Sequence, residues 1–330
     1  MLAKGKHNDL TDVAGVKVGH VTLYEKLNEQ DTICTGVTAI LPHSGNLFLK
    51  KTPAASYIIN GFGKTCGLVQ MNELGVLESP IMLTNTFSVA PVLQGTLAYM
   101  LKENKEIGDT TSSLNIVVGE CNDSYLNAMR LQAVTPEHAE MAIANARGEA
   151  FSQGAVGAGK GMVCFGHKGG IGSASRQIPR QDGKYYTIAC LVLSNFGKAE
   201  QARFANLTKK KIEMETADGS IMMIVATDAP VYDRQLQRIA KRCVVGLSRT
   251  GSIIANGSGD IAIAFSNANL QPHYTDSSIG QMAFIRDDSE EMEMIFQAIA
   301  EVAEEAIFNA LRYAETTNGR KGRTVKKAPI

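Results

Sequence analysis

Ser220 follows a glycine at the point where a charged stretch, Lys209 to Asp218, gives way to the apolar run Ile221 to Val225. A serine hydroxyl can attack the carbonyl of the residue before it, and Gly219 has no Cβ to oppose the strained backbone that this attack requires. Cleavage would leave Ser220 as a new N-terminus. Its α-amine, with a reference pKa of about 7.7 to 8, can serve as a base beside its own hydroxyl. The pair predicts self-cleavage and a serine that is nucleophile and base together.

The Gly-Ser dipeptide also has an ordinary structural interpretation. It recurs at Gly172-Ser173, Gly251-Ser252 and Gly257-Ser258. Gly and Ser are common turn residues ahead of a strand. From these residues alone, a scissile bond and a simple turn both remain open.

A second candidate lies in Asn256-Gly257-Ser258-Gly259-Asp260, just before the apolar run Ile261 to Phe265. If this segment is extended, Ser258 and Asp260 face the same side. A hydroxyl backed by a carboxylate could then relay the proton of a nucleophile on a neighbouring strand. The alternative is a hairpin turn, which Asn-Gly favours.

A third candidate, Glu120 to Asn127, follows a predicted strand that ends near Val118. Strand ends commonly carry functional sites. Tyr125 could donate a hydrogen bond at the reacting centre, and one of the acids could bind a cationic amine. Helix capping by Asn122 or Asp123 is the structural alternative.

Asn195 follows another predicted strand, Tyr186 to Leu193. Its side-chain amide could donate to an oxyanion, a role that typically contributes about a hundred- to a thousandfold in rate. An ordinary strand-ending turn is the alternative.

Composition indicates a globular protein. Of 330 residues, 44% are hydrophobic, and 33 Lys and Arg balance 33 Asp and Glu, so no net field attracts nucleic acid or an anionic membrane. The six cysteines show no metal-ligand spacing, which predicts buried thiols and no metal site. The polar N-terminus and the lack of a long apolar segment predict a cytoplasmic protein. The basic tail, Arg320 to Lys327, is expected to be a frayed end.

Strands and helices alternate in a mixed order, which favours a layered α+β fold over a purely parallel sheet. The expected helices are Ala90 to Lys102, Ser124 to Gln132, Pro136 to Arg147, Val231 to Leu247 and Ser289 to Ala314. The expected strands are Val13 to Val21, Ile33 to Leu41, Tyr57 to Ile59, Ile81 to Leu83, Leu114 to Val118, Met162 to Phe165, Tyr186 to Leu193, Ile221 to Ala226 and Ile261 to Phe265. The polar stretch from Lys198 to Gly219 is interpreted as a processing loop.

Together these motifs resemble the DmpA-like family of L-aminopeptidase D-amidase/D-esterases, which includes the β-aminopeptidases. The matching pieces span nearly the whole chain. They are Gly15 to His20, Gly36 to Pro42, Thr84 to Thr86, Glu120 to Asn127, Val156 to Gly159, Phe165 to Gly172, Ser194 to Gly197, Asp218 to Ser220 with Ala226 to Pro230, and Asn256 to Asp260.

The resemblance implies a four-layer αββα sandwich, shared with ornithine acetyltransferases. A single catalytic domain, residues 1–330, would cleave itself into an α chain, 1–219, and a β chain, 220–330. It also implies a hydrolase that needs no metal or organic cofactor, acts on small peptides, amides or esters, and assembles as a tetramer of αβ units.

Residue by residue, the resemblance implies that Ser220 is the nucleophile and Asn195 the oxyanion donor. Ser258 and Asp260 match the supporting serine and carboxylate, although some members carry Glu at the latter position. Tyr125 matches an auxiliary tyrosine, and Glu120 is assigned to the substrate's amine.

Two other functions remain open. The same fold could pass the acyl group to an amine, as an acyltransferase does, although the related transferases tend to carry Thr at the nucleophile position. Alternatively, an uncleaved homologue could bind a small molecule without catalysis.

Overall fold

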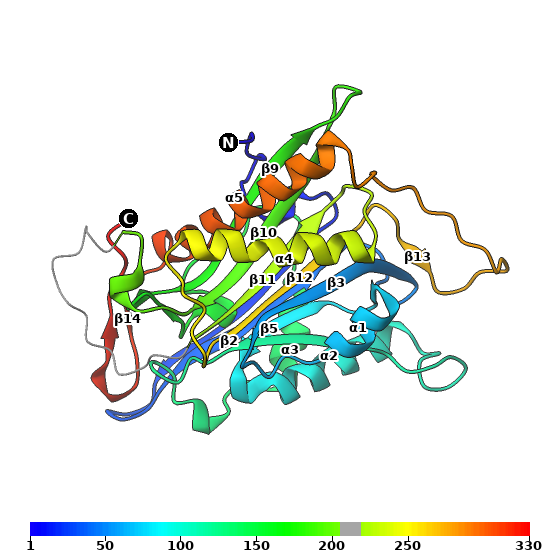
Figure 1. Ribbon diagram of the computed structural model, residues 1–330. Coiled ribbons are helices and arrows are strands. Elements are labelled where there is room, and N and C mark those ends of the chain that lie inside the picture. Colours follow the sequence, from blue (N-terminus) through cyan, green and yellow to red (C-terminus); the bar gives the residue numbers. More distant parts are fainter. Residues whose placement is uncertain (205–218) are drawn as a thin grey trace.

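The computed structural model describes residues 1–204 and 219–330. Figure 1 shows four layers, in the order helices, sheet, sheet, helices. The predicted α+β sandwich of αββα layers is therefore confirmed. Within the predicted processing loop, residues 205–218 lie outside the described residues.

The larger sheet has seven strands and carries Ser220 near its centre. Its order is β13 (Gln271–Pro272), β3 (Lys50–Gly61), β12 (Gly259–Ser266), β11 (Ser220–Thr227), β10 (Tyr185–Asn195) and β9 (Gly170–Pro179), with β4 (Val76–Leu77) paired to β3. β11 runs antiparallel to β10 and parallel to β12. The start of β11 thus meets the end of β10 and the start of β12.

The smaller sheet and four helices complete the layers. Its strand order is β1 (Lys17–Lys26), β2 (Thr32–Leu41), β5 (Ile81–Asn85) and β6 (Val117–Cys121). Its outer face is covered by α2 (Val89–Glu103) and α3 (Pro136–Ala144), and the larger sheet's outer face by α4 (Asp233–Arg249) and α5 (Glu290–Arg312) (Figure 1).

Both faces of β11 are buried, because the helices α4 and α5 cover one face and the smaller sheet covers the other. Ile221 and Met223 pack in the core beneath α4 and α5, whereas Met222 and Ile224 pack in the core between the two sheets. Since side chains alternate along a strand, Ser220 shares the face of Met222, toward the smaller sheet. A continuous apolar run thus places its first residue in the interior.

Helix α5 confirms the predicted amphipathic helix. The Ser289 side chain accepts from the backbone N–H of Met292 at 3.2 Å, which caps the N-terminus. The helix lies on β9 and β10, and a Cβ at Gly172 would lie 2.0 Å from the Ala306 carbonyl oxygen. Glycine therefore permits the close contact between helix and sheet.

Two expectations from the sequence are wrong, and two elements were not predicted. The segment Ser124 to Gln132 contains only a 3-10 turn, Met129–Leu131. The sequence also failed to reveal helix α1 (Leu68–Leu74) and strand β9. The basic tail is not frayed: β15 (Thr324–Val325) pairs with β14 (Thr317–Asn318).

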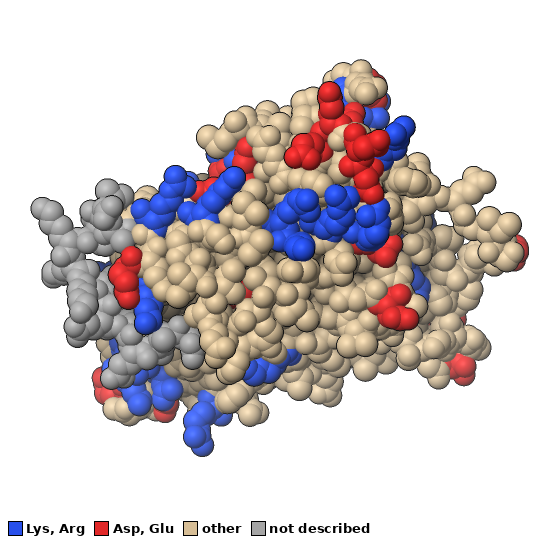
Figure 2. Space-filling model, in the orientation of Figure 1, with Lys and Arg blue, Asp and Glu red and all other residues tan. Residues whose placement is uncertain are grey.

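Figure 2 shows a row of Lys and Arg side chains over α4. Arg234 and Arg238 pair with Asp287, while Arg242 stacks 3.5 Å from the ring centroid of Phe296. This row is largely matched by local partners.

Within residues 1–204 and 219–330, no helix combines the length and apolar character needed to cross a membrane. Five of the six cysteines are buried and Cys66 is half-buried, so the expectation of mostly buried thiols is confirmed.

Candidate active site

Three adjacent strands bring four of the predicted residues together. Across the sheet, Ser220 pairs with Asn195 at the end of β10 and with Gly259 at the start of β12. Ser258 and Asp260 flank Gly259 in the chain. We call these five residues the Ser220 site. Ser220 is 6% exposed, so the site is nearly closed to solvent.

One backbone donor contacts both parts of the predicted scissile bond. The N–H of Gly259 lies 3.2 Å from the carbonyl oxygen of Gly219 and 3.3 Å from Ser220 Oγ. A donor at a carbonyl oxygen stabilises the negative charge that grows there during attack. Gly259 lies within the motif Asn256 to Asp260, but local sequence patterns assign no role to its backbone N–H.

Glycine is required on both sides of this contact. A Cβ at Gly219 would lie 2.0 Å from the backbone oxygen of Asn195, and a Cβ at Gly259 would lie 2.9 Å from the Cα of Gly63. Both distances are shorter than real side chains tolerate. These glycines therefore allow three backbone segments to approach one another around Ser220.

Ser258 and Asp260 face each other, as predicted from their spacing. The Ser258 hydroxyl donates to Asp260 Oδ1 at 2.5 Å. Burial raises the pKa of Asp260 to about 6, while the hydrogen bonds from Ser258 and the backbone of Ile221 act to lower it. A carboxylate with this pKa can exchange a proton near neutral pH.

The turn before β12 is held by a side chain that local sequence patterns did not reveal. Asn60 Nδ2 donates to the carbonyl oxygens of Ala255 at 3.2 Å, Asn256 at 3.0 Å and Ser258. The segment is thus a turn that leads into an extended strand. It is not a hairpin, because β12 pairs with β11 and β3 and residues 252–255 form no strand.

The amide of Asn195 is fixed at both ends. Its Oδ1 accepts from the Val163 N–H at 2.8 Å, and its Nδ2 donates to the Asn122 carbonyl at 2.8 Å. These two bonds determine which end of the amide is the donor. They leave one of the two Nδ2 hydrogens for another acceptor, which fits the predicted oxyanion donor.

Glu120 is 2% exposed, at the edge of the smaller sheet near this site. Its Oε1 accepts from the Lys64 N–H at 2.8 Å, and its Oε2 accepts from the Thr86 hydroxyl. A Cβ at Gly63 would lie 3.6 Å from Glu120 Oε1 and 3.7 Å from the Cα of Gly259. Glu120 and the start of β12 thus approach the same glycine.

Tyr125 lies in a separate cluster. It packs against the buried residues Cys34, Leu126 and Val325, and the guanidinium of Arg323 sits 4.4 Å from its ring centroid. In the part of the chain that the structure describes, no hydrogen bond joins its hydroxyl to the Ser220 site. Its role as an auxiliary donor stays a prediction.

A pocket of about 150 Å³ opens beside Gly219 and Ser258. Its other lining residues come from the loops after β10 and before β12. They are Phe196, Gly197, Lys198, Gln201, Ser252, Ile253 and Ala255.

Comparison with known proteins gives whole-length matches. Peptidase family S58 matches residues 8–325. The β-peptidyl aminopeptidase BapA of Sphingosinicella microcystinivorans is 37% identical over 98% of this chain and 86% of its own length.

Two solved structures have the same fold. A protein from Pyrococcus horikoshii OT3 superposes with a TM-score of 0.93 at 47% identity, covering 100% of this chain and 93% of that one. The L-aminopeptidase D-Ala-esterase/amidase of Ochrobactrum anthropi, described as a variant of the Ntn hydrolase fold, gives 0.92 at 29% identity, covering 99% and 93%.

These matches confirm the resemblance drawn from the motifs. They favour peptide-bond hydrolysis over the acyltransferase alternative and over a binder without catalysis. The protein is a hydrolase of peptide bonds, and its chain belongs to peptidase family S58.

Proposed function

We propose that the chain cleaves itself between Gly219 and Ser220, and that the freed serine then releases N-terminal amino acids from small peptides, amides or esters. The two products, residues 1–219 and 220–330, act as one catalytic domain. The observation that carries the proposal is the Gly259 N–H, which contacts both the Gly219 carbonyl oxygen and Ser220 Oγ.

Self-cleavage proceeds through an ester. Ser220 Oγ attacks the carbonyl carbon of Gly219 and gives up its proton, and the Gly259 N–H stabilises the oxyanion. The C–N bond then breaks, and the departing amine takes a proton. Water hydrolyses the resulting ester, which leaves a carboxylate on Gly219 and a free amine and hydroxyl on Ser220.

Turnover repeats this chemistry on a substrate. The α-amine of Ser220 accepts the hydroxyl proton as Oγ attacks the substrate's carbonyl, and Ser258 and Asp260 support the transfer of that proton. Asn195 donates its remaining amide hydrogen to the oxyanion. The leaving amine departs, and water releases the amino acid from the acyl-enzyme.

Two further residues have roles in the proposal. Glu120 binds the substrate's ammonium group, because a buried carboxylate near β12 is suited to a cationic partner. Tyr125 serves as an auxiliary donor. The names of the Sphingosinicella and Ochrobactrum relatives support aminopeptidase activity. A homo-oligomer of αβ units and a cytoplasmic location remain part of the proposal.

The test compares wild type with Ser220→Ala on aminoacyl p-nitroanilides. We expect hydrolysis by the wild type and none by the variant. Ser173→Ala is the matched control, because Ser173 also follows a glycine, is buried, and donates to the Cys190 carbonyl at 2.7 Å. It should retain activity. Activity in Ser220→Ala would refute the proposal.

A further inference from the structure

Lys168 is fully buried and binds three backbone carbonyls. Its Nζ donates to the oxygens of Gly159 at 2.9 Å, Met162 at 2.8 Å and Gly169 at 2.8 Å. An ammonium group has three N–H donors, so each one has a partner. The Lys168 side chain thus gathers the segment from Gly159 to Gly169 around a single cation.

This segment holds one end of the Asn195 amide. Within it, β7 (Val163–Cys164) pairs with β8 (His167–Lys168), and the Gly169 N–H donates to Met162 at 3.1 Å. The Val163 N–H donates to Asn195 Oδ1 at 2.8 Å. The position of that N–H therefore depends on a loop whose carbonyls converge on Lys168.

A second segment holds the other end. The Asn122 carbonyl accepts from Asn195 Nδ2, and the next residue, Asp123, is fully buried. Asp123 Oδ1 accepts from Asn127 at 3.0 Å, whereas Oδ2 has no partner among the described residues. A Cβ at Gly161 would lie 2.8 Å from the Asp123 Cβ, so the two segments pack directly together.

The two segments carry opposite charges, Lys168 on one and Asp123 on the other, and these charges attract each other. Burial lowers the pKa of Lys168 to about 7 and raises the pKa of Asp123 to about 7, and the charge of each acts to offset this effect on the other. Lys160, Cys34 and Cys164 also face Lys168.

From these contacts we infer that Lys168, with Asp123 as its buried counter-charge, is a positioning residue for Asn195. It holds the two segments that fix the Asn195 amide, so that the remaining Nδ2 hydrogen points at the oxyanion. This inference rests on the proposed function. It adds a residue that acts through Asn195 and does not touch the substrate.

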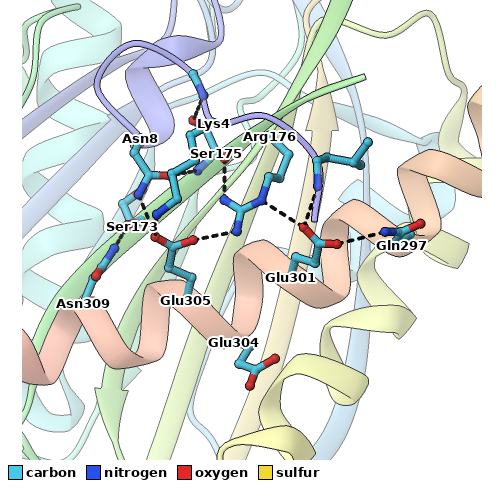
Figure 3. Close-up of polar contacts among 12 residues, drawn as sticks. Lys4, Asn8, Ser173, Ser175, Arg176, Gln297, Glu301, Glu304, Glu305 and Asn309 are labelled. Carbon is cyan, nitrogen blue, oxygen red and sulfur yellow. Dashed lines mark hydrogen bonds and ion pairs between the residues drawn. The ribbon is translucent and has the colours of Figure 1, made fainter. Parts of the chain in front are cut away.

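A second buried cation provides a matched control. Arg176, on β9, is 1% exposed and pairs with Glu301 and Glu305 of α5, while Lys4 and Asn8 also donate to Glu305 (Figure 3). We call these five residues the Arg176 cluster. Among the described residues, none of its hydrogen bonds or ion pairs reaches the Ser220 site, so losing this cation should affect stability and not catalysis.

The experiment is a double-mutant cycle of Lys168→Met and Asn195→Ala, with kcat and KM for an aminoacyl p-nitroanilide normalised to the cleaved fraction. We expect Lys168→Met to lower kcat by about ten- to a hundredfold, the scale of a small misplacement, with KM nearly unchanged. In Asn195→Ala, where the positioned group is gone, the same change should add less than about twofold. Arg176→Met should leave kcat unchanged.

Every outcome of this cycle either supports or contradicts the inference. Equal losses from Lys168→Met in both backgrounds, or an unchanged kcat, would contradict the inference while wild-type activity upholds the proposed function. An inactive wild type would refute both. If Lys168→Met does not fold, Asp123→Asn replaces it in the cycle with the same expectation, and misfolding of both variants would count against positioning.

Discussion

The Arg176 cluster and the Ser220 site each place a buried polar side chain on a strand of the same sheet, yet they differ in how their carboxylates are bound. Glu305 accepts from Lys4, Arg176 and Asn8, and Glu301 accepts from Arg176, Gln297 and the Leu2 N–H (Figure 3). Among the described residues, Asp260 has no cationic partner and is bound only by a hydroxyl and a backbone group.

The pKa shifts follow this difference. Burial acts to raise the pKa of Glu305, but the hydrogen bonds from Lys4 and Arg176 outweigh it and leave the pKa below its usual value. At Asp260 burial prevails, and the pKa rises to about 6. Glu305, which accepts several hydrogen bonds, stays ionised and ties the N-terminal segment, β9 and α5 together. Asp260, which accepts few, can exchange protons.

The largest expected effect is on catalysis. Asp260→Asn should lower kcat/KM by about 10² to 10⁴, the range of general acid–base catalysis, because an amide cannot accept the proton. Its melting temperature at pH 8 should be equal or higher, since a costly buried charge is removed. The control is Asp228→Asn, at the other end of β11, where burial also raises the pKa. An equal loss of kcat/KM in Asp260→Asn and Asp228→Asn would contradict a special role for Asp260.

The reverse pattern is expected at the Arg176 cluster. Arg176→Met should lower the free energy of unfolding by about 3 to 5 kcal/mol, because two carboxylates lose their buried partner. The kcat should not change. Arg203, which pairs with Glu304 at 66% side-chain exposure, is the control, and Arg203→Met should cost about 0 to 1 kcal/mol. Denaturant unfolding measures both, and a loss of catalysis in Arg176→Met would contradict the contrast.

Changing the pH should move the two regions in opposite directions. The folded pKa of Asp260 exceeds the model-peptide value of 3.8, so its contribution to stability falls as the pH rises through about 6. The folded pKa of Glu305 lies below 4.5, so its contribution is present above that pH and is lost as the pH falls through the folded pKa.

Unfolding of wild type, Asp260→Asn and Glu305→Gln from pH 3 to 8 isolates the two contributions. Asp260→Asn should gain stability over wild type between pH 4 and 6, and Glu305→Gln should be penalised most above pH 4.5. Wild-type kcat/KM should fall as the pH drops through about 8, because the Ser220 α-amine is then protonated, and should fall more steeply below about 6, where Asp260 is protonated as well. For each variant, the difference in unfolding free energy from wild type is plotted against pH. If this difference changed in the same direction with pH for both variants, the assignment would be contradicted.

The smallest effect is expected at Tyr125. If its hydroxyl donates to the reacting centre, Tyr125→Phe should lower kcat/KM by about two- to tenfold, since one neutral hydrogen bond contributes about 0.5 to 1.5 kcal/mol. The ring contacts with Arg323 and Leu126 remain, so stability should hold. An unchanged kcat/KM would exclude the auxiliary role.

Strong local patterns made much of the fold predictable. The apolar runs of β10, β11 and β12 and the periodic α5 were found because hydrophobic spacing determines them. Strand β9 was not predicted, because α5 packs so closely on it that small residues such as Gly172 take the place of the β-branched residues typical of strands. Helix α1 has only seven residues between two glycines with positive φ, Gly67 at 83° and Gly75 at 69°.

The wrong helix, Ser124 to Gln132, shows why the site was only partly predictable. Asn122 Oδ1 accepts from the Ser124 N–H, and the Ala128 N–H donates to the Thr32 carbonyl of β2 at 2.9 Å, so backbone groups of this segment bind partners outside a helix. Ser258 and Asp260 were found from their spacing. The Gly259 N–H and the loop gathered by Lys168 depend on contacts between distant segments, which local patterns do not reveal.

The most direct test of self-cleavage is the intact mass and N-terminal sequence of freshly purified, active wild-type protein, with Ser220→Ala alongside. We predict two fragments in the wild type, residues 1–219 and 220–330, with the second beginning Ser-Ile-Met-Met, and a single uncut chain in the variant. A fully active wild type that remains one chain of 330 residues would contradict the account.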